Sequence, residues 1–406
     1  MKILIASCVF PPEPLVSAKT SYDLAEFFSK RGDDVTVVCS KPNRNINIKQ
    51  VDYSSLNFKV RNLFTYVSNS ASLFSRFAEN FTFGFSLFFY ILFSKKPDVV
   101  YGNVWPLFSL SFLALACKIK GIKLIVSVQD LYPESLEQQG KLDKNHFIYN
   151  FLLRIDKFAV SLSSHVIVIS QSFKAAYFEK RNVDENKISV VKNWQKASDY
   201  ICIDKKIAKE KLSLIIKEDV SNDFTFVYGG NVGLASGVVD LVKVWIDAKI
   251  QSKLIIAGGG SLVPQILNLI SVNNCKNVVL LSPWLPEHTS LVYSSADVLV
   301  LPIATGQENS SVPSKLMGYM LSKKPILMKS STSSPASADL ESAGGGYVIK
   351  DFSENVVKTG VKFFTEKTHE DLEKLGELNY GFALKNYDSV RALNKVEMIV
   401  DDVLRY

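Results

Sequence analysis

The sequence predicts an α/β protein built from two Rossmann-like domains. Its 406 residues are too many for one ordinary hydrophobic core and indicate two domains of roughly 200 residues each. Short apolar runs alternate with helical patterns, and this alternation stops near residue 195 and restarts near residue 224. We therefore expect an N-terminal domain over residues 1–195, completed by a C-terminal helix over 387–406, and a second domain over residues 205–386.

The N-terminal half opens with the strand–loop–helix–strand order that marks a parallel sheet. Lys2–Cys8 is a short apolar run, typical of a strand buried on both faces, and Thr20–Arg31 has a helical pattern that ends before a glycine. Ligands of such sheets bind at the carboxyl ends of the strands, so the loop Val9–Lys19 is a candidate site wall. Its segment Pro11–Glu13 is equally well explained as a stiff turn. Further strands are expected near residues 34–39, 98–103, 123–130, 165–170 and 187–192.

Two carboxylates follow the expected strand 123–130, where a parallel sheet presents its ligand site. Asp130 and Glu134 flank Tyr132 and come just after Gln129. Either carboxylate could accept a proton or hydrogen-bond a hydroxyl group. Asp130 would serve equally well as the cap of a turn before the next helix, and the sequence leaves these two roles open.

Residues 63–96 stand out by their aromatic content. The segment Phe83–Phe93 is too short to span a bilayer. It is either a core helix or an interfacial helix, whose rings would lie at the lipid boundary with Lys95 and Lys96 at the head groups. The aromatic residues are Phe64, Tyr66, Phe74, Phe77, Phe81, Phe83, Phe85, Phe88, Phe89, Tyr90 and Phe93.

The second half restarts the strand–helix alternation and adds glycine-rich loops. Phe224–Gly233 is a strand that runs into such a loop, and Lys253–Gly260 ends in three glycines. Glycines let a backbone approach a phosphate or a base closely. Two such loops in one domain indicate a nucleotide site more strongly than one would. The other elements are expected near residues 238–248, 277–281, 296–302, 326–329, 347–349, 354–364 and 370–385.

The stretch from Thr305 to Pro325 follows the expected strand 296–302. Its small and polar residues turn into a helix at about Pro313, which is well tolerated in a first helical turn because its missing N–H would have no partner there. Free backbone N–H groups and the helix dipole favour an anion, and Lys315 could add a point charge for a phosphate. An ordinary capped helix is the alternative. The possible capping residues are Ser310, Ser311 and Ser314.

The composition argues against several other kinds of site. The net charge of +7 favours anionic ligands or an anionic membrane surface, and no basic recognition-helix pattern indicates a nucleic acid partner. The five cysteines and four histidines are scattered, without C-x-x-C spacing, which is typical of reduced cytoplasmic thiols without a zinc site. The first apolar run is too short for a secretory signal.

Motifs spread over nearly the whole chain resemble those of the family-4 retaining glycosyltransferases. Within that family they resemble enzymes of O-antigen and capsule synthesis, including the N-acetyl-fucosaminyl-type transferases. The resemblance implies the GT-B fold, in which two Rossmann-like domains face each other across a cleft. The matching stretches are Phe10–Glu13, Arg31–Val38, Val128–Glu134, Val166–Ser170, Lys187–Trp194, Gly230–Gly233, Ala257–Gly260 and Pro313–Met320.

The resemblance also implies the substrates and the location. The donor would be a nucleotide-sugar, UDP-linked and carrying an N-acetylhexosamine or a 6-deoxy analogue, held by the second domain. The acceptor would be a lipid-linked oligosaccharide held by the first domain, and transfer would retain the anomeric configuration without a metal or a cofactor. The protein would be peripheral at the cytoplasmic face of the inner membrane.

The same resemblance assigns roles to individual residues. Asp130 would lie near the reacting centre, while Lys315 would stabilise the leaving diphosphate and Glu308 would support the sugar. The donor-binding residues would be Gly230, Asn231, Gly233, Gly258, Gly259, Ser310, Ser311, Ser314, Lys315 and Tyr319. The acceptor side would comprise Pro12, Glu13, Ser17, Tyr132 and Glu134.

The chain departs from the family pattern at its acidic pair. Gly318 and Ser310 stand where the two glutamates are usual, and Glu308 would replace only the first of them. Asn231 and Ser236 stand where a basic pair is common. These departures keep open a second hypothesis, a degenerate non-catalytic domain that acts as a binding partner in a polysaccharide-assembly complex. A sugar-nucleotide epimerase shares the fold but is disfavoured, because few histidines lie at loop positions.

Overall fold

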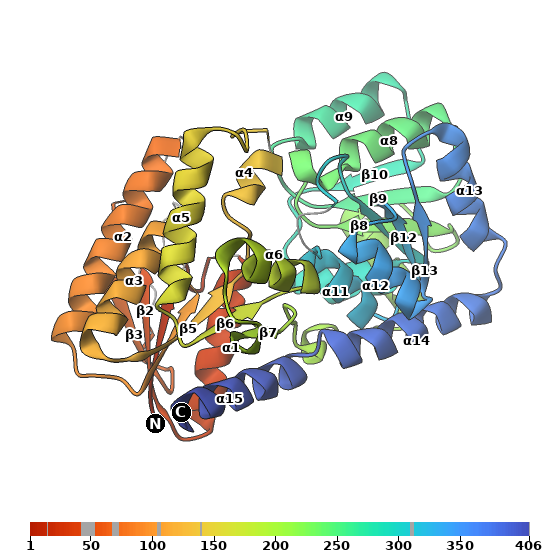
Figure 1. Ribbon diagram of the computed structural model, residues 1–406. Helices are drawn as coiled ribbons and strands as arrows, with labels where there is room; N and C mark the ends of the chain where they lie inside the picture. Colours follow the sequence, from red (N-terminus) through yellow and green to blue (C-terminus); the bar gives the residue numbers. More distant parts are fainter. Residues whose placement is uncertain are drawn as a thin grey trace. The chain divides into compact units, whose positions relative to one another are not determined.

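The computed structural model describes residues 1–13, 15–41, 53–66, 73–103, 107–138, 140–308 and 312–405 (Figure 1). The chain divides into two compact units. The first unit is Met1–Asn193 together with Ser389–Tyr406, and the second unit is Trp194–Asp388. Residues 196–204, which the sequence analysis left between the two domains, belong to the second unit, as do Trp194 and Gln195. Each unit is built on its own parallel sheet, so the α/β fold class is confirmed.

The first unit contains a seven-stranded sheet in the order β3-β2-β1-β4-β5-β6-β7, with all neighbouring strands parallel. The expectations did not include β3, because an edge strand with mostly exposed or half-buried residues lacks the continuous apolar run of a central strand. The strands are β1 (Lys2–Ser7), β2 (Asp34–Ser40), β3 (Lys59–Leu63), β4 (Val99–Asn103), β5 (Lys123–Val128), β6 (His165–Val168) and β7 (Ile188–Val190).

Helices cover both faces of this sheet. Successive residues of a strand point to opposite faces, so along β1 Leu4 and Ala6 belong to the core beneath α2, α3 and α5. On the opposite face α1 packs on β1 and β2, and α15 packs on α1 and β5. The helices are α1 (Val16–Lys30), α2 (Leu73–Phe93), α3 (Leu107–Lys120), α4 (Glu134–Gln138), α5 (Phe147–Ser161), α6 (Gln171–Arg181) and α15 (Ser389–Arg405), with the 3-10 turn η1 (Glu185–Lys187).

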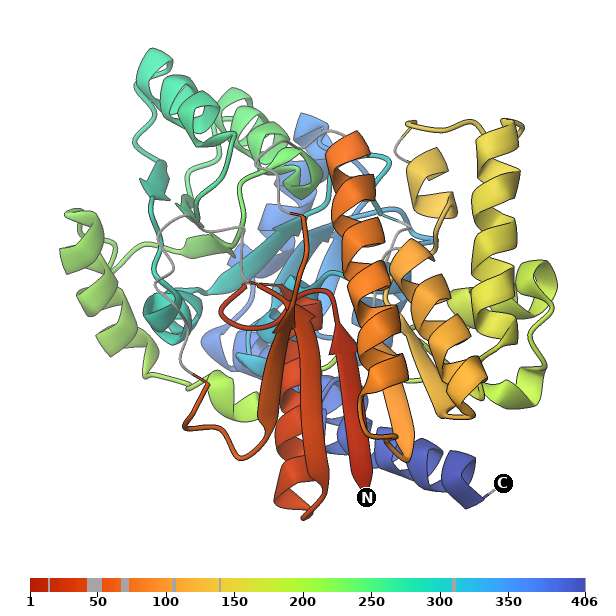
Figure 2. The ribbon, with the colours of Figure 1, turned by 90° about the vertical axis from the view of Figure 1, so that its left-hand side faces the viewer.

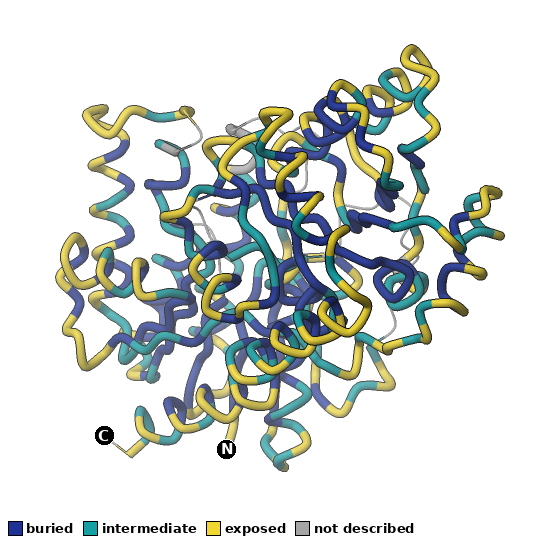
Figure 3. The backbone as a smooth tube through the Cα atoms, turned by 90° about the vertical axis from the view of Figure 1, so that its right-hand side faces the viewer, coloured by how far each residue is buried: buried dark blue, intermediate teal, exposed yellow. Residues whose placement is uncertain are grey.

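The second unit contains a six-stranded parallel sheet in the order β10-β9-β8-β11-β12-β13. Its strands are buried, and the turns that face outward on the surrounding helices are exposed (Figure 3). Each strand begins within two residues of its expected position. The strands are β8 (Thr225–Gly229), β9 (Lys253–Ala257), β10 (Val278–Leu281), β11 (Val298–Pro302), β12 (Ile326–Lys329) and β13 (Gly346–Ile349).

Two apolar cores lie on the two faces of this second sheet. One contains residues of α7, α10, α11, α12 and α14, and the other contains residues of α8, α9 and α13. The expectations did not include α9 and α12, which are only ten and nine residues long. The helices are α7 (Lys205–Ile216), α8 (Val238–Asp247), α9 (Val263–Val272), α10 (Thr289–Ser295), α11 (Ser314–Leu321), α12 (Pro335–Ala343), α13 (Glu354–Thr365) and α14 (His369–Asn386), with the 3-10 turns η2 (Ala197–Asp199), η3 (Leu234–Ser236) and η4 (Pro286–His288).

Candidate functional site

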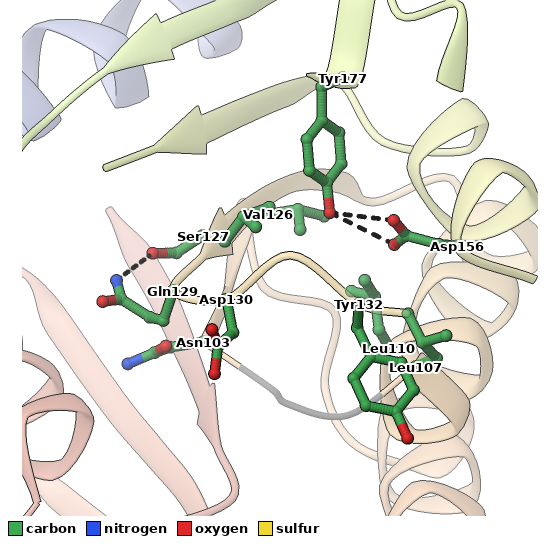
Figure 4. Close-up of a pocket in the computed structure, with 11 residues that line it drawn as sticks. Asn103, Leu107, Leu110, Val126, Ser127, Gln129, Asp130, Tyr132, Asp156 and Tyr177 are labelled. Atoms are coloured by element: carbon green, nitrogen blue, oxygen red, sulfur yellow. Dashed lines mark hydrogen bonds between the residues drawn. The ribbon is translucent and has the colours of Figure 1, made fainter. Parts of the chain in front are cut away.

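A small pocket of the first unit lies at the carboxyl ends of β4 and β5 (Figure 4). Asp130 and Tyr132, two of the predicted site residues, line it together with Gln129 and Asn103. The Asp130 side chain is half-buried, and burial raises the pKa of its carboxyl above the usual value of 3.8. A carboxylate with a raised pKa beside amide side chains is a suitable acceptor for a hydroxyl proton or hydrogen bond.

Asn103 ties this pocket to the first turn of α1. Its Nδ2 donates to the Ser17 carbonyl oxygen at 3.1 Å and to Ser21 Oγ at 2.8 Å. Ser21 Oγ in turn donates to Ser7 Oγ at 3.0 Å, at the end of β1. The carboxyl ends of β1 and β4 and the start of α1 are thereby joined. The sequence analysis did not single out Asn103, although its place at the end of a buried parallel strand was a usable signal.

The other predicted acceptor-side residues take different positions. Pro12 is exposed and Glu13 is buried in the loop that follows β1. Ser17 lies in α1 and contributes its backbone carbonyl to the contact with Asn103. None of these three residues lines the pocket of Asp130 and Tyr132.

Glu134 belongs to a buried ion-pair cluster. Arg181 reaches its two carboxylate oxygens at 2.6 and 2.7 Å, and also donates to Asp156 Oδ2 at 2.8 Å and to the Tyr132 carbonyl at 3.0 Å. Tyr177 donates to Asp156 at 3.1 Å (Figure 4). Burial opposes ionisation of Glu134, but the hydrogen bonds and charge of Arg181 outweigh it and hold the pKa of Glu134 below 4.5. The cluster fixes the loop that carries Asp130.

A larger pocket lies in the second unit, at the carboxyl end of β11 and the start of α11. Its volume is ≈ 280 Å³. Three of the predicted donor-site residues line it, and the other lining residues come from the ends of neighbouring elements. The lining residues are Tyr228, Asn231, Ala235, Ser236, Leu301, Pro302, Ile303, Gln307, Pro313, Ser314 and Lys315.

Lys315 is the charged side chain of this pocket. Its stem packs on Gly230, where an added Cβ would lie 2.0 Å from Lys315 Cε. Its Nζ lies 5.6 Å from the ring centroid of Tyr228. No carboxylate among the described residues forms an ion pair with Lys315, and burial lowers its pKa below the usual 10.5. An anion in the pocket would offset this unfavourable burial of the charge.

The glycine loops of the second unit pack backbone against backbone. The Gly230 N–H donates to the Ala257 carbonyl at 2.8 Å, and the Val232 N–H donates to the Gly259 carbonyl at 2.8 Å. Gly230 has a φ of 150°, which L side chains rarely adopt. Gly233 does not line the pocket but accepts a hydrogen bond from Ser236 Oγ, which does. The predicted donor-site glycines Gly230, Gly258 and Gly259 do not line the pocket. The β8 loop contributes Asn231 to its lining, and the β9 loop packs behind the β8 loop.

Tyr319 acts on the main chain at the end of β8. Its hydroxyl accepts a hydrogen bond from the Gly229 N–H at 2.9 Å and donates to the Gly229 carbonyl at 3.1 Å. The side chain is fully buried and does not line the pocket. Tyr319 therefore positions the residue before Gly230.

The start of α11 differs in detail from the prediction. Pro313 is the residue before the helix, and Ser314 is its first helical residue, so neither supplies a side-chain cap. The Ser314 carbonyl accepts a hydrogen bond from Gln195 Nε2 at 2.9 Å. Ser310 and Ser311, two other predicted donor-site residues, lie outside the described residues.

Glu308 is held in place by Lys329, a residue that sequence reasoning missed. Lys329 Nζ lies 2.7 Å from Glu308 Oε1, and the Gly306 N–H donates to Glu308 Oε2 at 2.7 Å. Burial opposes ionisation of Glu308, but the hydrogen bond from Lys329 outweighs it and keeps the pKa of Glu308 below 4.5. The pair fixes the turn over residues 305–308 after β11. Glu308 itself does not line the pocket.

The two neighbouring glycines of the β9 loop offer a matched test. A Cβ at Gly258 would lie 1.9 Å from the Gly230 carbonyl oxygen, whereas a Cβ at Gly259 would have no atom within 4 Å. We expect Gly258→Ala to destabilise the second unit by about 1–3 kcal/mol, because the two loops must separate. Gly259→Ala is expected to change stability by less than about 0.5 kcal/mol. Urea unfolding of both variants checks this, and equal effects would contradict the packing described.

Within the described residues, no group of three or more His, Cys, Asp or Glu side chains is placed to hold a metal ion. Separately, none of the helices in the described part of the chain has the length and apolar character needed to cross a membrane.

Comparisons with known proteins agree with this architecture. Residues 17–194 match the model of Glycosyltransferase Family 4. The glycosyltransferase WbjE of Pseudomonas aeruginosa is 24% identical over 77% of this chain and 76% of its own length. WcaI of Escherichia coli K12, whose name places it as a glycosyl transferase of colanic acid biosynthesis, is 23% identical over 60% of this chain and 62% of its own.

The solved structures extend the likeness to the whole fold. HepE of Anabaena, crystallised with UDP, superposes with a TM-score of 0.71 at 16% identity, covering 99% of this chain and 100% of its own. At that identity the likeness establishes the fold. With the sequence pattern of Glycosyltransferase Family 4 in its first unit and the GT-B fold over its length, this chain is a glycosyltransferase.

Proposed function

We propose that this protein is a retaining glycosyltransferase that moves a sugar from a UDP-linked donor to a lipid-linked oligosaccharide. The second unit binds the donor and the first unit binds the acceptor. The name of the relative WcaI assigns it to colanic acid biosynthesis. This supports a polysaccharide such as O-antigen, capsule or exopolysaccharide as the product. The acceptor lipid would bring the protein to the cytoplasmic face of the inner membrane as a peripheral protein.

The observation that carries the donor site is the half-buried side chain of Lys315, which has no carboxylate partner among the described residues. It lies at the start of α11, in a pocket of ≈ 280 Å³. The backbone N–H groups of the first helical turn lack helical partners, and the helix dipole adds partial positive charge. An ammonium and a helix start in one pocket are suited to a diphosphate. HepE, which has the same fold, was crystallised with UDP.

The chemistry that this site would supply is stabilisation of the leaving group. As the bond between sugar and diphosphate breaks, negative charge grows on the departing phosphate oxygen. Lys315 and the α11 amides would stabilise that charge without reorganising. Glu308, held by Lys329 beside the pocket, is proposed to position the sugar. Asp130 is proposed to orient the acceptor hydroxyl in the first unit.

Calorimetric binding of nucleotides tests the donor site. We expect UDP and UDP-N-acetylhexosamines to bind the wild-type protein more tightly than GDP does. Lys315→Ala should weaken UDP binding by about tenfold or more, because a charge-assisted contact worth about 1.5–3 kcal/mol is lost. Lys358→Ala, which removes an exposed lysine from α13, should leave UDP binding unchanged.

The same titration decides between the two hypotheses raised by the sequence. Binding of UDP that disappears in Lys315→Ala places the donor at the start of α11. If none of the nucleotides binds, the donor site is absent and the degenerate, non-catalytic hypothesis replaces the proposal. If UDP binds equally well to wild type and Lys315→Ala, the donor lies elsewhere on the chain.

A further inference from the structure

A ladder of phenylalanine rings lies exposed along α2. Its members are spaced four residues apart, so each lies one helical turn beyond the previous one. Neighbouring rings contact each other with centroids 4.8–6.4 Å apart. The exposed fractions are 45% for Phe77, 41% for Phe81, 49% for Phe85, 41% for Phe89 and 83% for Phe93.

The opposite side of α2 forms the core contact of the helix. Phe83, Leu87 and Ile91 are almost fully buried against the first sheet and α3. The ladder rings Phe77, Phe81 and Phe85 also make edge contacts with Phe108 and Phe112 of α3, but every ladder ring stays at least 41% exposed. The structure confirms the core role for one side of the helix, and the interfacial role that the sequence left open concerns the opposite side.

Other exposed aromatic residues flank the ladder. The Phe64 carbonyl accepts a hydrogen bond from Ser86 Oγ, and the Tyr66 N–H donates to Thr82 Oγ1, so this segment lies against α2. Helix α3 packs beside α2, and α5 packs beside α3 (Figure 2). We call the exposed apolar residues of these segments the aromatic face: Phe64, Tyr66, Phe77, Phe81, Phe85, Phe89, Phe93, Leu115, Ile119, Phe147, Phe151 and Phe158.

In the described part of α2, α3 and α5 the exposed charges are of one sign, although Asp98 is exposed shortly after Lys95 and Lys96. Lys118, Arg154 and Lys157 are exposed on α3 and α5, and Lys95 and Lys96 are exposed just after α2. In the described part of these three helices no acidic side chain is exposed, since Glu79 is half-buried and Asp156 is buried beside Arg181. A soluble partner-free surface would mix both signs of charge around its few apolar side chains.

The basic residues also have a definite place. Lys95 and Lys96 precede β4, and Lys118 precedes β5 by a few residues. They therefore lie at the edge of the sheet where the strands begin, at the C-terminal ends of α2 and α3. Lys120 caps the last turn of α2 by donating to the Ile91 carbonyl at 2.7 Å. Aromatic rings beside a row of exposed lysines are suited to the boundary between acyl chains and anionic head groups.

We propose that the aromatic face docks the protein on a bilayer that contains anionic phospholipid. The rings of α2 enter the interfacial region, and the lysines contact the head groups. The helix lies in the plane of the surface, because its other side stays packed on the sheet. This inference deepens the proposed function, since it rests on an acceptor that is itself anchored in lipid.

Vesicle co-sedimentation tests the docking directly. The probes are vesicles of phosphatidylcholine alone and of phosphatidylcholine mixed with phosphatidylglycerol. The test variant combines Phe85→Gln, Phe89→Gln and Phe93→Gln, because glutamine keeps the helical preference while removing the rings. The control combines Leu214→Gln, Leu267→Gln and Val272→Gln, which removes three exposed apolar side chains from the second unit.

We expect the wild type and the control to bind the mixed vesicles and to bind phosphatidylcholine alone much more weakly. The phenylalanine variant should bind the mixed vesicles at least about tenfold more weakly. Replacing Lys95 and Lys96 with glutamine should weaken binding by about fivefold for each charge. Circular dichroism and UDP binding of each variant show whether it remains folded.

The outcomes separate this inference from the proposed function. A folded wild type that binds UDP but no vesicles overturns the docking and leaves the donor site standing. A wild type that binds vesicles but no nucleotide supports the docking and overturns the proposed donor site. If the wild type is a dimer in sedimentation velocity and the phenylalanine variant is a monomer, with neither binding vesicles, the face joins two copies of the chain and the lipid proposal is wrong.

Discussion

Replacing Arg181 with methionine is expected to destabilise the first unit by about 3–5 kcal/mol at pH 7. The guanidinium is fully buried and forms ion pairs with Glu134 and Asp156 at 2.6 and 2.8 Å. Its removal leaves two carboxylates buried without that cation. Methionine fills a volume similar to that of arginine. The loss of stability therefore reports mainly the removal of the charge and only weakly a change in packing. Urea unfolding followed by circular dichroism measures the change.

The destabilisation should depend on pH in a definite direction. In the wild type the pKa of Glu134 lies below 4.5, so its contribution to stability is fully present above pH 4.5 and is lost as the pH falls through the lowered pKa. Asp156 has the opposite sign: burial raises its pKa above 3.8, so ionising it costs stability as the pH rises. In Arg181→Met the lowering effect of the guanidinium is lost, so the pKa of Glu134 rises and the already raised pKa of Asp156 rises further. The difference in the free energy of unfolding between wild type and variant should therefore be smallest near pH 4 and largest near neutrality.

Arg154→Met provides the matched control for this experiment. Arg154 is exposed on α5, the same helix that carries Asp156. A surface arginine without a buried partner should contribute less than about 0.5 kcal/mol. Arg181→Met could lower the free energy of unfolding by no more than the control does, or by an amount that does not change with pH. Either result would show that the cluster does not stabilise the unit as described.

The positions of the central strands along the chain were predictable because parallel sheets bury these strands on both faces. Runs such as Leu254–Ala257 and Val298–Pro302 are apolar throughout, which is typical of central strands. The edge strand β3 is half-exposed and polar, so its sequence carries no such signal. The helix α2 is aromatic on both sides, so its sequence predicted a helix but could not say which side faces the core.

The candidate sites were predictable only where they follow strand ends. Asp130 and Lys315 each come shortly after a buried strand, and both line pockets. The ion pairs that hold these loops were not visible, because their partners are far apart in sequence. Arg181 and Glu134 are 47 residues apart, and Lys329 and Glu308 are 21 apart. Lys329 ends β12, the neighbour of the strand that precedes Glu308, whereas Arg181 and Glu134 lie on the helices α6 and α4. Both pairs are therefore set by tertiary packing.

Replacing Asp130 with asparagine is expected to lower turnover by about 10²–10⁴-fold while leaving donor binding unchanged. Asp130 lines the pocket of the first unit, whereas the proposed donor pocket belongs to the second. Asparagine keeps the size of the side chain but cannot carry the negative charge that would orient an acceptor hydroxyl. Sugar transfer to a lipid-linked saccharide extract and UDP calorimetry measure the two effects separately.

The pH profile distinguishes this role from a structural one. If the ionised carboxylate is required, activity is present above the pKa of Asp130 and falls as the pH drops through it. Because burial raises that pKa above 3.8, the acid limb of kcat/KM should lie at a higher pH than for an exposed aspartate. The limb should vanish in Asp130→Asn and persist in Glu137→Gln, which alters a nearby carboxylate of α4. An unchanged limb in Asp130→Asn would assign the titration to another group and leave Asp130 as a turn residue, the alternative that the sequence had kept open.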